Sequence, residues 1–193
     1  KADFVERLAR GLEKTWTVCT AWALMSNHYH LLLRASTRPI GELLGGYAAN
    51  YNRRHRRSGY VFQNRFTSIL CEEESYFLDL LRYIHLNPVR AGLVTDVREL
   101  ERYTWTGHAT LIGTRQCNWQ RTTEVLTRFG RTTPGSRGRY RQFISQRSSD
   151  DSVMDFDGGG LVRSAGGWEA LTKARSDHKN RIGDERILAA CRT

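Results

Sequence analysis

The chain has 193 residues, which is room for one sizeable domain with an appendage but is crowded for two full domains. Its 30 Lys and Arg residues against 20 Asp and Glu residues give a net charge of +10, and most of the basic residues are arginines, whose planar fork suits phosphate. No apolar stretch approaches the roughly 18 residues of a membrane span, and the four cysteines lack zinc-finger or disulfide-framework spacing, so we expect a cytoplasmic protein without membrane contact.

The first part of the chain predicts a helix followed by a β-hairpin. Residues 3–13 carry apolar side chains at helical spacing, and residues 15–24 form a β-prone run. After a tight connection at 25–27, a second strand over 28–35 returns beside the first.

The returning strand carries two histidines, His28 and His30, two positions apart. In an extended chain, residues i and i+2 point to the same face about 7 Å apart, so the two imidazoles could share one divalent ion. Tyr29 would then point to the opposite face. Taken alone, such a pair is more typical of two exposed or hydrogen-bonded strand side chains than of a metal site.

Two further helices and a short strand are predicted next. A helix over 39–55 has an apolar side and a basic far end. The arginines at that end are Arg53, Arg54, Arg56 and Arg57. A strand over 67–71 leads into a helix that should end near Asn87, because Pro88 disfavours helical geometry at the residue before it.

The last third of the chain gives weaker signals. Residues 121–147 contain many arginines against the single acid Glu124 and predict a basic, mobile arm. A Ser-, Asp- and Gly-rich linker follows, and residues 168–191 have mixed helical character. The chain accordingly divides into a core domain, a basic arm with linker, and a C-terminal helical extension, at residues 1–112, 113–157 and 158–193.

Tyr83 and Asn87 are candidates for a reaction centre because, four residues apart on a helix, they lie on the same side. A free phenol, with a pKa of about 10, is a poor nucleophile and needs an electrophile that a metal makes more reactive. Taken alone, Tyr83 is more typical of a half-buried helix tyrosine, and Asn87 of a helix C-terminal residue before proline, than of a reaction centre. Together with His28 and His30, they supply a metal pair, an oxygen ligand and a nucleophile for phosphodiester transfer.

Three segments in this order, 25–33, 59–66 and 82–94, resemble the IS200-like tyrosine transposases, and most of all the REP-associated tyrosine transposases. These are a single-tyrosine branch of the HUH endonucleases. The resemblance covers about residues 1–112, with further similarity in the downstream region. It implies an α+β fold built on a ferredoxin-like antiparallel sheet with helices on one face.

The resemblance also implies the chemistry and the ligands. His28, His30 and Asn87 would bind Mg²⁺ or Mn²⁺, and Tyr83 would form a 5′-phosphotyrosine with single-stranded DNA while freeing a 3′-OH. The implied DNA contains hairpins or palindromic repeats, and the protein, as monomer or homodimer, would cleave and rejoin it during transposition at the bacterial nucleoid. The candidates for phosphate contacts are Arg53, Arg54, Arg56, Arg57 and Arg65.

One departure from the family leaves the activity open. The family's sheet normally begins with a strand that precedes the first helix and lies beside the histidine strand, and this chain has no residues for it. We therefore expect a missing N-terminal strand and an open sheet edge, with a catalytically impaired, DNA-binding copy as the alternative function. A phosphohydrolase is disfavoured because the chain has neither a third alternating histidine nor a second His-x-Thr/Ser motif. Tyr60, Phe62 and Phe66 could stack on bases, although aromatics around a strand are more often part of the core.

Overall fold

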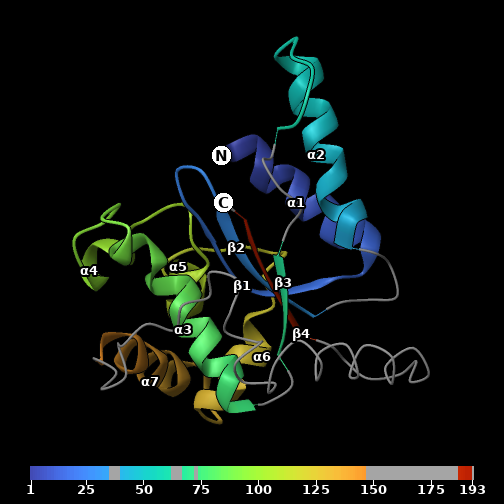
Figure 1. Ribbon diagram of the computed structural model, residues 1–193. Coiled ribbons are helices and arrows are strands. Elements are labelled where there is room, and N and C mark those ends of the chain that lie inside the picture. The colour runs from blue at the N-terminus through green and yellow to red at the C-terminus, as the bar shows by residue number, and fades with distance from the viewer. Residues whose placement is uncertain (35–39, 62–66, 72–73, 147–186, 193) are drawn as a thin grey trace, which may run out of the picture.

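A four-stranded antiparallel sheet lies at the centre of the protein in the computed structural model (Figure 1). The structure describes residues 1–34, 40–61, 67–71, 74–146 and 187–192. The strands are β1 (Val18–Leu24), β2 (Tyr29–Arg34), β3 (Thr67–Cys71) and β4 (Ile187–Arg192). Their order in the sheet is β1-β2-β4-β3, and each neighbouring pair is antiparallel. The protein is therefore of the α+β class, as the sequence predicts.

Seven α-helices and one 3-10 turn surround this sheet in the described residues. They are α1 (Ala2–Thr15), α2 (Ile40–Arg54), α3 (Glu74–Arg90), α4 (Val97–Leu100), α5 (His108–Ile112), α6 (Thr122–Leu126), η1 (Thr127–Phe129) and α7 (Thr133–Ser145). Among these helices, none has the length and apolar character needed to cross a membrane.

Helix α1 and the β1–β2 hairpin form where the sequence predicts them. Phe4, Leu8 and Leu12, spaced by four, give α1 one buried apolar stripe. The helix ends at Thr15, and the residue that follows it, Trp16, takes the left-handed conformation with φ 57°. In the hairpin, Leu24 pairs with Tyr29, and the connection between them is closed by a backbone hydrogen bond from residue 25 to residue 28 of 2.9 Å.

Helices cover both faces of the sheet. Tyr29, Leu31 and Leu33 of β2 pack in one buried cluster with α1, whereas Leu32 packs in a second cluster with α3. The expectation of helices on one face is therefore wrong. The physical reason is that β2 is apolar at consecutive positions, so its alternating side chains must be buried on opposite sides.

Strand β4 fills the place beside the histidine strand that we expected to be vacant. It lies between β2 and β3, and residue 191 pairs with His30 on one side and with Thr67 on the other. Figure 1 shows it in red at the middle of the sheet. The backbone groups on this side of β2 are thus paired rather than left open. The prediction of helical character is also wrong for Ile187–Arg192, which is extended.

The outer edge of β1 is covered by loops from the second half of the chain. The N–H of Leu24 donates to the carbonyl of Trp105 at 2.8 Å, and the N–H of Arg121 donates to the carbonyl of Cys19 at 2.8 Å. These bonds pair some of the backbone groups along the β1 edge, which could otherwise pair with a strand of another chain.

The described part of 121–147 is folded, so the prediction of a basic, mobile arm is wrong there. It forms α6, η1 and α7, and Val125, Tyr140 and Ile144 are buried in the same cluster as α3. Burial of these apolar side chains stabilises the helices, and the arginines do not oppose it because they can stay at the surface while one helix side is buried. The boundaries at residues 112 and 157 stay predictions, and residues 147–186, which include the predicted linker, lie outside the described residues.

Candidate active site

The two histidines of the predicted metal pair lie side by side at the start of β2. The ring centroids of His28 and His30 are 5.0 Å apart, and the ring planes are perpendicular at 90°. His28 is half-buried, and its Nδ1 lies 2.8 Å from the Oδ1 of Asn27. Because an amide oxygen only accepts, Nδ1 of His28 donates to it, and Nε2 is the ring nitrogen that would bind a metal.

His30 is held in its neutral form. Its side chain is only 3% exposed, and burial, together with the nearby charge of His28, lowers its pKa from 6.5 to about 3. An imidazole binds a metal only when it is neutral, so His30 is in the ligand form at neutral pH without first losing a proton.

Tyr83 lies against the histidine pair. Its ring centroid is 5.4 Å from that of His30, with the planes at 86°. Helix α3 brings it there because Leu81 and Ile84 are buried in the cluster that the sheet forms with α3. Residues from two elements that are far apart in the sequence thus meet at one place within one chain, which the sequence alone leaves open.

Asn87 follows Tyr83 by one helical turn and is buried, with 8% exposure. Its Nδ2 donates a 2.9 Å hydrogen bond to the main-chain carbonyl of Tyr83. This bond uses the amide nitrogen and leaves Oδ1, the atom that would bind a metal, uncommitted by it. The amide is therefore oriented by the turn that carries the tyrosine.

Helix α3 continues beyond the predicted end at Asn87 and runs to Arg90 with Pro88 inside it. Pro88 lacks an N–H, so one bond of the helix is lost, but its fixed φ suits helical backbone. The following turn is closed by the N–H of Ala91 donating to Asn87 at 2.9 Å and that of Leu93 donating to Pro88 at 2.9 Å. A proline this close to the helix end therefore destabilises the helix less than the predicted end near Asn87 requires.

The extra turn adds a residue that the sequence reasoning missed. The guanidinium carbon of Arg90 lies 5.2 Å from the centroid of the Tyr83 ring. Its spacing of seven residues from Tyr83 is a signal for the same helix side, but only when the helix extends past Pro88.

A buried polar cluster, here called the Tyr140 cluster and formed by His85, His108 and Tyr140, connects α3 to α5 and α7. The hydroxyl of Tyr140 lies 2.9 Å from Nδ1 of His85 and 2.8 Å from Nδ1 of His108. A single hydroxyl hydrogen can serve only one of them, so Tyr140 donates to one imidazole and accepts from the other. The cluster holds α3 against α5 and α7.

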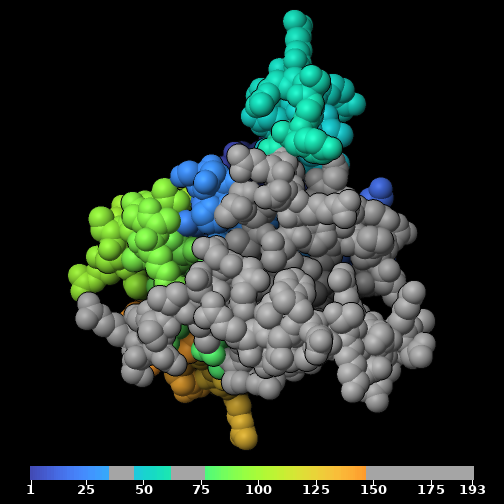
Figure 2. All heavy atoms as spheres, in the orientation of Figure 1, coloured from blue at the N-terminus to red at the C-terminus, as the bar shows by residue number. Residues whose placement is uncertain are grey.

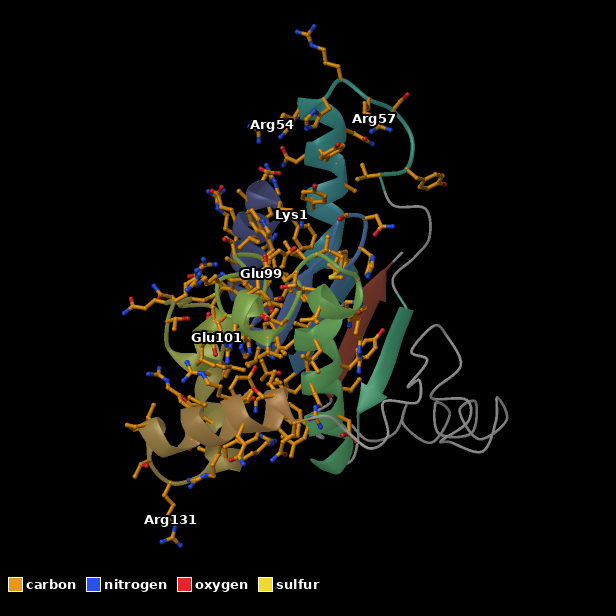
Figure 3. The ribbon with its side chains drawn as sticks, turned by 90° about the vertical axis from the view of Figure 1, so that its left-hand side faces the viewer. Lys1, Arg54, Arg57, Glu99, Glu101 and Arg131 are labelled. Carbon is orange, nitrogen blue, oxygen red and sulfur yellow. The ribbon has the colours of Figure 1, made fainter. Side chains whose placement is uncertain are left out.

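The arginines predicted to contact phosphate lie at the far end of α2 and just beyond it. Arg53, Arg54, Arg56 and Arg57, here called the α2 arginines, are all exposed. Arg54 and Arg57 lie at the end of α2 that points away from the body of the protein (Figure 3), and this end stands out as a projection (Figure 2). Arg65 lies outside the described residues.

The α2 projection starts on the sheet face opposite Tyr83. Tyr47 of α2 makes an edge-on contact with Phe4 of α1 at 5.0 Å between centroids, and both belong to the α1 side of the sheet. The α2 arginines therefore do not share a face with the histidine pair. Tyr60, beyond α2, is 96% exposed, so the core alternative is wrong for this residue.

Comparisons with models of protein families, with curated proteins and with solved structures found no match to this chain. The described residues hold no group of three or more His, Cys, Asp or Glu side chains that could bind a metal ion. A metal at His28 and His30 would thus depend on the Asn87 amide, on water and on substrate oxygens for its remaining ligands.

Proposed function

We propose that this protein is a metal-dependent single-tyrosine HUH transposase of the REP-associated type, with a ferredoxin-like core. It cleaves and rejoins single-stranded DNA at hairpin or palindromic repeats. The observation that carries the proposal is the placement of Tyr83, a potential nucleophile, 5.4 Å from His30, which is itself 5.0 Å from His28. An imidazole pair beside a tyrosine is the minimum set of groups for metal-assisted phosphodiester transfer.

The residues present fit a divalent cation. His30 offers a neutral imidazole nitrogen, His28 supplies a second imidazole beside it, and the Nδ2 bond of Asn87 leaves its amide oxygen as a third donor. Imidazole is a better ligand for Mn²⁺ than for Mg²⁺, whereas the amide oxygen suits both. A bound ion would draw electron density from a phosphate oxygen and orient the phosphate.

The residues of the chain account for the remaining chemistry. The Oη of Tyr83 forms a bond to phosphorus, and the bond between phosphorus and O3′ breaks. The phenol loses its proton, and the departing O3′ gains one to become a free 3′-OH. One phosphodiester replaces another, so rejoining is the reverse reaction and needs no ATP.

The α2 projection supports a DNA substrate. Four exposed arginines and the exposed ring of Tyr60 lie at or just beyond its tip, which combines charge for phosphates with a surface for base stacking. The same projection also favours the second candidate, a module that binds DNA without chemistry, because it needs nothing from the histidine pair.

A covalent-capture experiment separates the two candidates. The protein is incubated with Mn²⁺ and a library of 3′-labelled single-stranded oligonucleotides, each with a hairpin stem and randomised flanks, and is then run on a denaturing gel. We expect a labelled adduct that disappears in Tyr83→Phe and persists in Tyr103→Phe, a matched control in which the lost hydroxyl bonds to the Leu24 carbonyl. Salt-dependent binding without any adduct would instead select the DNA-binding module, and an adduct that survives Tyr83→Phe would refute the nucleophile.

A further inference from the structure

Arg90 is placed to act on the same phosphate as Tyr83. Its guanidinium carbon lies 5.2 Å from the centre of the Tyr83 ring, and that ring lies 5.4 Å from His30. The tyrosine therefore has a metal-ligand candidate and a permanent cation as neighbours. Arg90 is exposed, so DNA can reach it.

The local backbone fixes this position. Tyr83 and Arg90 are seven residues apart, two turns along α3, and thus lie on one side of the helix. Directly after Arg90 the chain turns at Gly92, which has φ 65°, and the N–H groups of Leu93 and Val94 both donate to the carbonyl of Pro88. Val94 is buried, which anchors the end of the helix and with it the last turn.

Nearby arginines are directed elsewhere. Arg82, next to Tyr83 in the sequence, lies 4.8 Å from the centre of the Phe143 ring on α7. The α2 arginines extend from the opposite face of the sheet. In the part of the chain that the structure describes, Arg90 is thus the arginine that is found at the Tyr83 ring.

We propose that Arg90 is a catalytic residue that binds the nonbridging oxygens of the phosphate attacked by Tyr83. This inference rests on the proposed function. As the Oη–phosphorus bond forms and the bond to O3′ breaks, negative charge is carried by those oxygens, and a guanidinium fork can hold two of them at once. A positioned cation of this kind stabilises the transition state more than the ground state.

The test compares Arg90→Gln, Arg90→Lys and the wild type in adduct formation with the captured hairpin DNA and Mn²⁺. We expect Arg90→Gln to slow the reaction about 100-fold, and Arg90→Lys to recover part of the rate, because it keeps the charge but not the fork. Arg10→Gln is the matched control, because it removes one exposed arginine from α1 on the other face of the sheet. It should react like the wild type.

A second substrate distinguishes phosphate binding from a merely structural contact with the tyrosine ring. In this substrate, a methylphosphonate replaces the phosphate at the position where the captured DNA is cleaved, which removes the negative charge of that phosphate. On this substrate, Arg90→Gln should form the adduct less than about tenfold more slowly than the wild type, because the charge that Arg90 neutralises is gone. Equal losses on both substrates, or no loss on either, would refute the role of Arg90 and leave the proposed function standing. Absence of a Tyr83-dependent adduct in the wild type would refute both.

Discussion

Mild acid should destabilise this protein through the Tyr140 cluster. His85 and His108 are both fully buried, and they share the hydroxyl of Tyr140 at 2.9 and 2.8 Å. Burial lowers the pKa of His108 from 6.5 to about 4, with a further contribution from the charge of Arg141. Burial also lowers the pKa of His85 well below its ordinary value, and the neighbouring His108 adds to this effect.

The sign and size of the effect follow from these pKa values. Between pH 6.5 and pH 4 the unfolded chain binds a proton at His108 that the native protein does not, so the free energy of unfolding falls as the pH falls. Because the pKa of His108 falls from 6.5 in the unfolded chain to about 4 in the native protein, His108 alone lowers the free energy of unfolding by about 2 kcal/mol between pH 7.5 and pH 5. His85 acts in the same direction, so the loss is a large part of the stability of an ordinary domain.

Urea unfolding followed by circular dichroism at pH 7.5, 6.0 and 5.0 measures this dependence. His108→Asn should be less stable at pH 7.5 but should lose less on acidification, because one of the protons taken up on unfolding is gone. His55→Asn removes an exposed imidazole beyond the end of α2 and should keep the wild-type slope. A wild-type free energy that does not change between pH 7.5 and 5, or an unchanged slope in His108→Asn, would refute the reasoning.

Three further predictions concern the site and its supports. Changing all four α2 arginines to Gln should reduce the slope of log affinity against log salt for single-stranded DNA by about 3, measured by fluorescence anisotropy; an unchanged slope would exclude these contacts. Tyr140→Phe leaves two buried imidazole nitrogens without their hydroxyl partner and should lower the free energy of unfolding by about 2 kcal/mol in urea titrations, whereas a neutral effect would contradict the shared hydrogen bond. His30→Gln should weaken Mn²⁺ binding at least about tenfold in calorimetric titrations, and equal affinity would place the metal elsewhere.

The local elements of the first half of the chain could be predicted from the sequence. The helix over 3–13, the hairpin and the strand over 67–71 all form, because each is determined by side-chain periodicity and turn residues close together in the chain. The sequence assigns Tyr83 and the histidine pair to one site but does not say whether they meet within one chain or between two subunits; the ring distance shows that Tyr83 and His30 of the same chain lie together.

The errors have separate physical causes. The burial of both faces of the sheet was already indicated by the unbroken apolar run Leu31, Leu32 and Leu33, which a strand with one wet face would not carry. Helix α7 was missed because the arginine excess of the run 121–147 predicts an arm, although Tyr140 and Ile144 are spaced for one buried helix side. Arg90 was missed because Pro88 was treated as the end of the helix.

The position of β4 has a consequence for how the protein folds during synthesis. Residue 29 in β2 pairs with residue 192, so the centre of the sheet depends on a contact between segments that leave the ribosome far apart in time. Until β4 arrives, β2 and β3 have no partner between them, and both present unpaired backbone that can associate with other chains. Contacts between such distant residues also slow folding. The histidine strand thus reaches its final surroundings late, which delays the assembly of the site until residues 187–192 have been translated.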